Sequence, residues 1–290
     1  MSINMNTLCI QCLLNKHIEA ARALDTQKAI PFTRDLMDIL NQNLDNSPSA
    51  NAAAKINCLY QKHFGLGQDL YVQEKKESNA FVKARLDEID ALVQQQKDPV
   101  FAALQFSILG NYLDFSALKG QVSYEKLDEM LQKALQMQLD VEAYESLCRD
   151  LEHGKKLLYF TDNAGEIGFD RIFAQQLHKK YPHLQITFCV RGLPAHNDAT
   201  REDAAFMEIP FSVIDTGNAI GGVDIPSLGQ QAKQALEEAD VIIAKGMGNT
   251  ESMFGCGYPV YYAFLVKCPR FVEFFNKPHM TPMLLKETAK

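Results

Sequence analysis

The stretch KLLYFTDNAGEIG, residues 156–168, joins an apolar run to an acid, an amide and a glycine. Its first part, Lys156 to Phe160, has the length and composition of a buried β-strand. Asp162, Asn163 and Gly165 follow, and a helix-compatible stretch comes next. Because a simple surface turn would need only Asn-Gly or Asp-Gly, this order predicts a strand, a loop that carries functional groups, and then a helix.

The half of the chain after residue 150 repeats this pattern. Short apolar runs alternate with helical stretches at ITFCV (186–190), FSVID (211–215) and VIIA (241–244). This alternation is typical of a parallel sheet covered by helices. Before residue 150 the periodicity is helical and predicts no strand. We therefore expect an α/β fold in which a helical first half packs against a parallel sheet.

The composition indicates a globular protein and excludes some partners. The 290 residues are 47% hydrophobic, enough for a substantial core. The formal net charge of -7 argues against a nucleic-acid partner, which would need a basic face. No apolar run approaches the ~18 residues of a membrane span, and the start MSINMNT lacks the apolar core of a signal peptide. We expect a cytoplasmic protein with no membrane partner, and the sequence does not indicate an oligomeric state.

The cysteines do not form an obvious framework. Seven cysteines, an odd number, are scattered over the chain, which is unlike a secreted disulfide scaffold. Only Cys9 and Cys12 are closely paired, and no second pair completes a local zinc site. They share one helical face with Leu13 and Lys16, which predicts packing thiols. A redox pair or half of a metal site is the alternative.

Polar residues and glycines follow each predicted strand. In open α/β sheets, ligands bind beyond the carboxyl ends of the strands, where loops and helix N-termini converge. We therefore expect these residues to meet at one rim of the sheet. The four strand ends contribute Thr161, Asp162 and Asn163; Arg191, Gly192, His196, Asn197 and Asp198; Thr216, Gly217 and Asn218; and Lys245, Gly246, Gly248 and Asn249.

The oxygen ligands at this rim suit a hard divalent metal. Asp162, Asn163 and Asp198 offer carboxylate and amide oxygens, which favour Mg²⁺ or Mn²⁺. The alternative is structural: Asp162 and Asn163 would form a turn and a helix cap, and Asp198 would cap a helix that begins near Ala199.

The fourth strand end has the components of an anion site. Lys245 supplies a cation, while Gly246 and Gly248 allow backbone N–H groups to approach a phosphate closely. In the structural alternative the lysine stem packs with its charge in water, and the glycines make a turn.

A helix in the first half carries a polar stripe. Asp98 and Pro99 are suited to its N-cap and first turn. Ser107, Asn111 and Asp114 follow at spacings i, i+4 and i+7 in an otherwise apolar segment. Such a stripe needs polar partners. Either it bonds to a neighbouring loop, or Asn111 and Asp114 reach the metal or substrate.

Several stretches together resemble one family. TDNAGEIGFDR, VRGLPAHNDAT and KGMGNTES are similar to motifs of the metal-dependent damage-control phosphatases, domain-of-unknown-function family 89. CIQCLL, DLYVQEKKESN and GNYLDF are similar to further family motifs in the same order. The resemblance covers most of the chain and is strongest to the bacterial and archaeal branch that carries the CxxC.

The resemblance implies a fold, a reaction and a ligand set. It implies an all-helical N-terminal region, residues 1–150, on a three-layer α/β/α domain, residues 151–290, with a mostly parallel, Rossmann-like sheet. It implies hydrolysis of phosphate esters of small metabolites with Mg²⁺, Mn²⁺, Co²⁺ or Ni²⁺. The family's metal ligands fall on Asp162, Asn163 and Asp198, and its anion-binding lysine on Lys245, with Asn249 in the same loop. The chain departs from the family pattern at Gln11, Lys16, Leu70, Met247 and Thr250, which bears on substrate preference.

The leading hypothesis is a phosphatase for sugar phosphates or damaged phosphorylated cofactors, in which a metal-activated water attacks phosphorus. Catalytic candidates are Asp162, Asp198 and Glu166, the last to orient the water. An aspartyl nucleophile is one alternative, although position 164 is Ala where such enzymes commonly have a second Asp. A non-catalytic nucleotide or sugar-phosphate binder is another, and no glycine-rich loop supports a methyltransferase. The phosphate-binding candidates are Lys245, Gly246, Gly248, Asn249, Arg191, Asn111 and Asp114.

Overall fold

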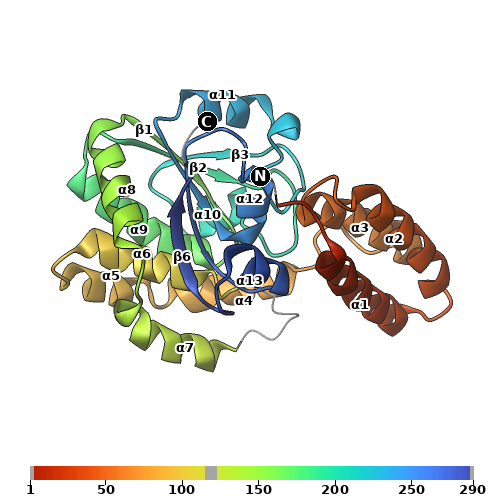
Figure 1. Cartoon of the computed structure of the whole chain (residues 1–290). Helices are drawn as coiled ribbons and strands as arrows, with labels where there is room; N and C mark the ends of the chain where they lie inside the picture. Colours follow the sequence, from red (N-terminus) through yellow and green to blue (C-terminus); the bar gives the residue numbers. More distant parts are fainter. Residues whose placement is uncertain (1–2, 115–122, 288–290) are drawn as a thin grey trace.

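The computed structural model describes residues 3–114 and 123–287 and has a central six-stranded sheet, with strand order β3-β2-β1-β4-β5-β6 (Figure 1). The first five strands are parallel and β6 is antiparallel to β5. The predicted α/β fold is thus confirmed, and the four strands expected from the sequence are β1 to β4. The strands are β1 (Lys156–Phe160), β2 (Gln185–Val190), β3 (Ser212–Asp215), β4 (Val241–Lys245), β5 (Val260–Leu265) and β6 (Pro282–Lys286).

Helices cover both faces of the sheet, so the domain has three layers. Alternate strand residues point to opposite faces: Tyr159 and Phe188 pack under one helical layer, Phe160 and Tyr262 under the other. The first layer includes α5 (Leu86–Gln94), α6 (Pro99–Gly110), α8 (Val141–His153), α9 (Glu166–Lys180) and α10 (Arg201–Phe206). The second includes α11 (Gln230–Glu238), α12 (Gly246–Met253) and α13 (Pro269–Phe275).

The first three helices form a lobe that projects from the sheet domain (Figure 1). The lobe consists of α1 (Thr7–Leu24), α2 (Ala29–Asn43) and α3 (Ser49–Phe64). It has its own core, which includes Phe32, Leu36 and Ile56. The remaining helices of the first half share the core under the sheet instead. The boundary expected near residue 150 therefore separates an all-helical part from the part that contains the strands, but it falls within one continuous core.

Two segments of the first half whose periodicity is helical do not form single helices. The segment Phe81 to Leu92 is split between α4 (Val72–Lys83) and α5. The segment Tyr124 to Leu139 forms α7 (Tyr124–Lys133), followed by the 3-10 turn η1 (Ala134–Gln136). A second 3-10 turn, η2 (Ile225–Ser227), precedes α11. Among the described residues, no helix combines the length and apolar character needed to cross a membrane.

The strand order reverses between β1 and β4. From β1 the chain continues through β2 to β3, whereas β4 leads to β5 on the other side. The connections after β1 and β4 therefore diverge and leave a crevice at the carboxyl ends of these strands, which is the usual ligand position in such sheets. Asp162, in the loop after β1, and Lys245, the last residue of β4, lie at this point.

Candidate metal and phosphate site

The loops after β1 and β2 bring the predicted metal ligands together. Ala199 N donates to Asp162 O at 2.7 Å, and Asn163 and Asp198 form an isolated antiparallel bridge. This backbone pairing places Asp162, Asn163 and Asp198 on one wall of a pocket with a volume of about 190 Å³. The sequence prediction that these residues meet at the rim agrees with the structure.

The helix-cap part of the structural alternative does not hold for these residues. The N-cap of α9 is Gly165, with φ of 77° and no side-chain cap, so neither Asp162 nor Asn163 caps that helix. The helix after Asp198 is capped by Thr200 in a capping box with Asp203. Capping therefore does not explain the three side chains.

Asp162 is held by amides and crowded by like charges. Its Oδ2 accepts from Asn111 Nδ2 and from Asn163 Nδ2, each at 2.8 Å. Burial, followed by the charges of Asp198 and Glu166, raises the pKa of Asp162 well above its ordinary value. A bound cation would supply the opposite charge that favours the ionised carboxylate, and it would lower this pKa.

Asp198 is oriented by a buried arginine. Arg191 Nε donates to Asp198 Oδ2 at 2.6 Å, and Arg191 Nη2 donates to Asn249 Oδ1 at 2.8 Å. Burial raises the pKa of Asp198 to about 6, although Arg191 opposes the shift. We expected Arg191 and Asn249 to bind phosphate, but both are fully buried and neither lines the pocket. Arg191 bonds directly to Asp198, and Asn249 holds Arg191 in turn, so we infer that the two residues position Asp198.

Lys245 lies behind the pocket, which corrects the expectation that its ammonium group faces a phosphoryl group. Its Nζ donates to Glu166 Oε1 at 2.9 Å, Asp170 Oδ1 at 2.7 Å and Ser107 O at 2.9 Å. Burial lowers the pKa of Lys245, but the charges of Asp170 and Glu166 outweigh it and raise the pKa above the ordinary value. An ammonium group has three protons to donate, and all three have acceptors here.

Glu166 is enclosed in the same way, so the structure differs from the expectation that it orients water. Its carboxylate is fully buried, does not line the pocket, and accepts from Lys245, Asn111 and Asn163. Asn163 Nδ2 donates to Glu166 Oε2 at 2.6 Å. Glu166 therefore fixes the amide of a predicted metal ligand.

Asn111 and Asp114 fulfil different roles. Asn111 bonds to Asp162 and Glu166 and is buried behind them, whereas Asp114 lines the pocket. Lys267 Nζ donates to Asn111 O at 2.6 Å and to Asp114 Oδ2 at 2.7 Å. The last residue of the GNYLDF motif, Phe115, lies outside the described residues.

The two glycines after β4 are required by close packing. Gly246 has φ of 79°, and a Cβ there would overlap the Asp162 carboxylate. A Cβ at Gly248 would overlap the backbone oxygen of Gly221. Gly248 lines the pocket and Gly246 does not, so their proposed contact with an anion stays a prediction.

The sequence reasoning missed two members of the network, Asp170 and Lys267. Asp170 is one helical turn after Glu166 in α9, and this i, i+4 spacing on a buried helix could have indicated it. Lys267 follows β5 just as Lys245 ends β4. Because β5 was not predicted, the residues at its end were not considered.

The charges around Asp162 do not balance. Five carboxylates and three cations leave two formal negative charges in their ionised forms, in the interior or at the pocket wall. They are Asp114, Asp162, Glu166, Asp170 and Asp198, with Arg191, Lys245 and Lys267.

The donor atoms fit a divalent metal with few protein ligands. Hydrogen bonds within residues 3–114 and 123–287 engage Oδ2 of Asp162 and of Asp198 but not their Oδ1 atoms. Asn163 Oδ1 accepts from Asn197 at 2.9 Å and keeps a second lone pair. The same described residues contain no cluster of three or more His, Cys, Asp or Glu arranged for a metal. The candidate set is therefore two carboxylates and an amide, a small set typical of Mg²⁺ sites that retain water.

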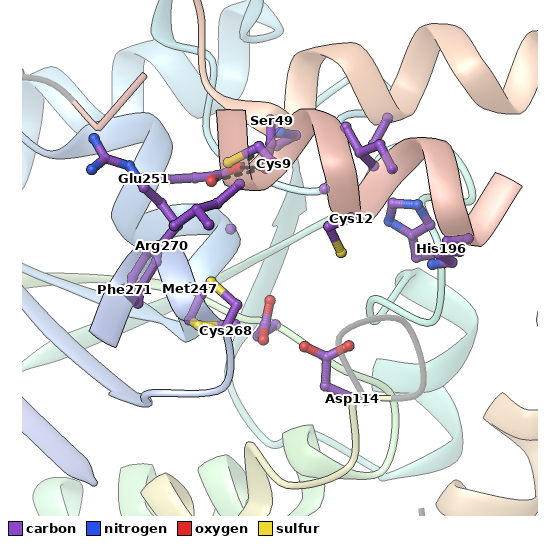
Figure 2. Close-up of a pocket in the computed structure, with 18 of the residues that line it drawn as sticks. Cys9, Cys12, Ser49, Asp114, His196, Met247, Glu251, Cys268, Arg270 and Phe271 are labelled. Atoms are coloured by element: carbon purple, nitrogen blue, oxygen red, sulfur yellow. Dashed lines mark hydrogen bonds between the residues drawn. The ribbon is translucent and has the colours of Figure 1, made fainter. Parts of the chain in front are cut away.

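The cysteines take two different environments. Cys9 is half-buried and packs against the core of the lobe, as expected of a packing thiol, but Cys12 is exposed. Both line the pocket together with Cys268 (Figure 2).

The comparisons identify the family. The model of the damage-control phosphatase ARMT1-like domain matches residues 5–281. The chain belongs to this family. A protein named damage-control phosphatase from Archaeoglobus fulgidus is 31% identical over 92% of this chain and 93% of that protein. An uncharacterised protein from Methanocaldococcus jannaschii is 30% identical over 94% and 92%. The crystal structure of a DUF89 family protein from Pyrococcus horikoshii superimposes with a TM-score of 0.84 at 25% identity, over 98% of this chain and 99% of that one.

Proposed function

We propose that this member of the damage-control phosphatase family hydrolyses phosphate monoesters of small metabolites, such as sugar phosphates or damaged phosphorylated cofactors, with a divalent metal. Family membership supports a phosphatase role. The observation that carries the metal dependence is the meeting of two carboxylates, Asp162 and Asp198, at the pocket wall, where burial raises the pKa of both. A divalent cation would compensate the charge of their ionised forms.

Asp162, Asn163 and Asp198 would hold the metal. When bound, Mg²⁺ or Mn²⁺, or alternatively Co²⁺ or Ni²⁺, would act as a Lewis acid on the phosphoryl group and lower the pKa of a water molecule. The residues behind the pocket fix this ligand set: Arg191 orients Asp198, and Glu166 orients Asn163. Removing such a supporting contact typically lowers metal affinity or activity about 10–100-fold.

The pocket also offers positive charge for a phosphate. Lys16 and Arg270 line it, and Lys16 is close enough to His196 to help burial lower the pKa of that imidazole to about 3. His196 is therefore neutral near pH 7. We assign Lys16, rather than the enclosed Lys245, as a cation that faces the bound phosphate.

The test is release of inorganic phosphate by the metal-free protein supplied with Mg²⁺, Mn²⁺, Co²⁺ or Ni²⁺ and a panel of phosphate monoesters. The proposal predicts turnover that depends on metal and stops on chelation. Ligand binding without turnover under every condition would indicate the non-catalytic binder instead. A phosphoenzyme trapped on Asp162 would indicate the aspartyl nucleophile.

A further inference from the structure

The walls of the pocket differ in chemistry from the acidic end where Asp162 and Asp198 lie. One side of α1 forms much of the wall, with Leu8, Cys9, Cys12, Leu13 and Lys16. Their spacing places them on one face of the helix. The CxxC motif thus belongs to a pocket wall that is mostly carbon and sulfur.

The facing wall is similarly apolar and comes from the sheet domain. It includes Met247 at the start of α12, and Cys268 and Phe271 at the start of α13. Figure 2 shows Cys12 on one side, with Met247 and Cys268 on the other and Asp114 toward the acidic end. Thiol, thioether and hydrocarbon surfaces attract apolar groups and offer little to a hydroxyl.

Polar side chains of the wall make contacts with the protein. Ser49 Oγ donates to Glu251 Oε1 at 2.8 Å. The Arg270 guanidinium lies 5.3 Å from the ring centroid of Phe274, and its buried Nε has no hydrogen-bond partner among the described residues. Lys16 Nζ lies 6.0 Å from the ring centroid of Tyr71. Because this wall is mostly carbon and sulfur, a leaving group with many hydroxyls would lose hydration on entry without an equal number of new hydrogen bonds.

The volume limits the size of the substrate. Pockets for drug-sized ligands occupy roughly 300–1,000 Å³, whereas this pocket has about 190 Å³. The phosphate must occupy the acidic end, so the rest of the substrate has only the apolar part of the pocket. This space suits a compact group and excludes a dinucleotide.

We propose that the pocket selects phosphate monoesters whose leaving group is compact and apolar, such as a short alkyl, thioether or single-ring alcohol, and that the pocket-facing side of α1 is the selecting wall. This inference rests on the phosphatase function proposed above and narrows its substrate range, because it disfavours the sugar phosphates named there. It assigns the CxxC helix to substrate recognition rather than to chemistry at phosphorus.

The experiment compares three esters of primary alcohols with Mn²⁺: benzyl phosphate, glycerol 3-phosphate and phosphoglycolate. The common alcohol type limits differences in leaving-group reactivity. We expect kcat/KM for benzyl phosphate to exceed that for glycerol 3-phosphate by about tenfold or more, the scale on which apolar pockets discriminate. Leu8→Asn on α1 and Met247→Gln on the facing wall should each reduce this ratio several-fold.

Leu24→Asn is the matched control, because Leu24 is on the same helix, is 48% exposed and does not line the pocket. It should leave the ratio unchanged. Equal or better turnover of glycerol 3-phosphate, or an unchanged ratio in both wall variants, would overturn the inference while leaving the phosphatase intact. A preference for phosphoglycolate would also overturn it and assign selection to Lys16 and Arg270. Absence of phosphate release from all three esters and from the wider panel would instead reject the phosphatase function.

Discussion

Arg191 and Asp198 form a buried ion pair, with Arg191 Nε 2.6 Å from Asp198 Oδ2 and both side chains shielded from solvent. The pair connects the end of β2 to a predicted metal ligand, and Asn249 extends it to helix α12 after β4. The position of Asp198 therefore depends on a side chain that does not enter the pocket.

Arg191→Lys should impair the site while keeping a positive charge. Lysine lacks the planar guanidinium group, whose three nitrogens donate to Asp198, to the backbone oxygen of Gly222 and to Asn249. We expect Mn²⁺ affinity and kcat/KM to fall about 10–100-fold, as measured by titration and phosphate release. Arg201→Lys is the control, since Arg201 makes an exposed pair with Asp215. Equal effects of the two changes would reject a positioning role for Arg191.

Lys245→Met should destabilise the fold as well as the site. The change leaves Glu166 and Asp170 buried without their cation, and breaking a buried pair costs about 3–5 kcal/mol. The free energy of unfolding from urea denaturation should fall by that amount. Lys156→Met removes an exposed pair with Glu238 and should cost below about 1 kcal/mol. A stable Lys245→Met protein with weakened phosphate binding would restore the direct phosphate role that the structure argues against.

Gly246→Ala should displace the Asp162 carboxylate. Two effects are combined at this position, an unfavourable positive φ and overlap of the new methyl group with Asp162. Gly65→Ala separates them, because Gly65 has φ of 70° and no atom within 4 Å of an added Cβ. Both variants should lose about 1–2 kcal/mol of stability, because alanine is unfavourable in the left-handed backbone conformation. A loss of Mn²⁺ affinity only in Gly246→Ala is the expected result, and matched affinities would show that Asp162 tolerates the methyl group.

Glu251 should make stability depend on pH. This carboxylate accepts from Ser49 Oγ and from Ala50 N at the start of α3, and so connects the lobe to the sheet domain. Burial raises the pKa of Glu251 from 4.5 to about 7. The native state then retains a proton that the unfolded chain has lost, so this contribution is fully present below pH 4.5 and is lost as the pH rises toward and through 7.

The measurement is the free energy of unfolding at pH 4.5 and pH 8 for the wild type and Glu251→Gln. Gln keeps an acceptor oxygen but does not titrate. From pH 4.5 to pH 8, the free energy of unfolding of the wild type should fall by up to about 3 kcal/mol more than that of the variant. Identical pH dependence would mean that Glu251 titrates normally.

The sequence predicted the residues that meet at the pocket better than the residues that support them. Asp162, Asn163 and Asp198 could be identified because each follows a recognisable strand, and parallel strands deliver their ends to one edge. The direction of the Lys245 side chain was not predictable, since it depends on acceptors from α6 and α9 that only tertiary packing brings to it. The pocket face of α1 looked like a packing face because an apolar stripe does not reveal whether it faces a core or a substrate.

The most direct test of the metal site is Mn²⁺ binding to the metal-free protein, measured by calorimetry for the wild type, Asp162→Ala and the exposed-site control Asp215→Ala. We predict saturable binding to the wild type and to Asp215→Ala, and its loss in a folded Asp162→Ala protein together with a fall in phosphate release of orders of magnitude. Unchanged Mn²⁺ affinity and turnover in Asp162→Ala would contradict the account.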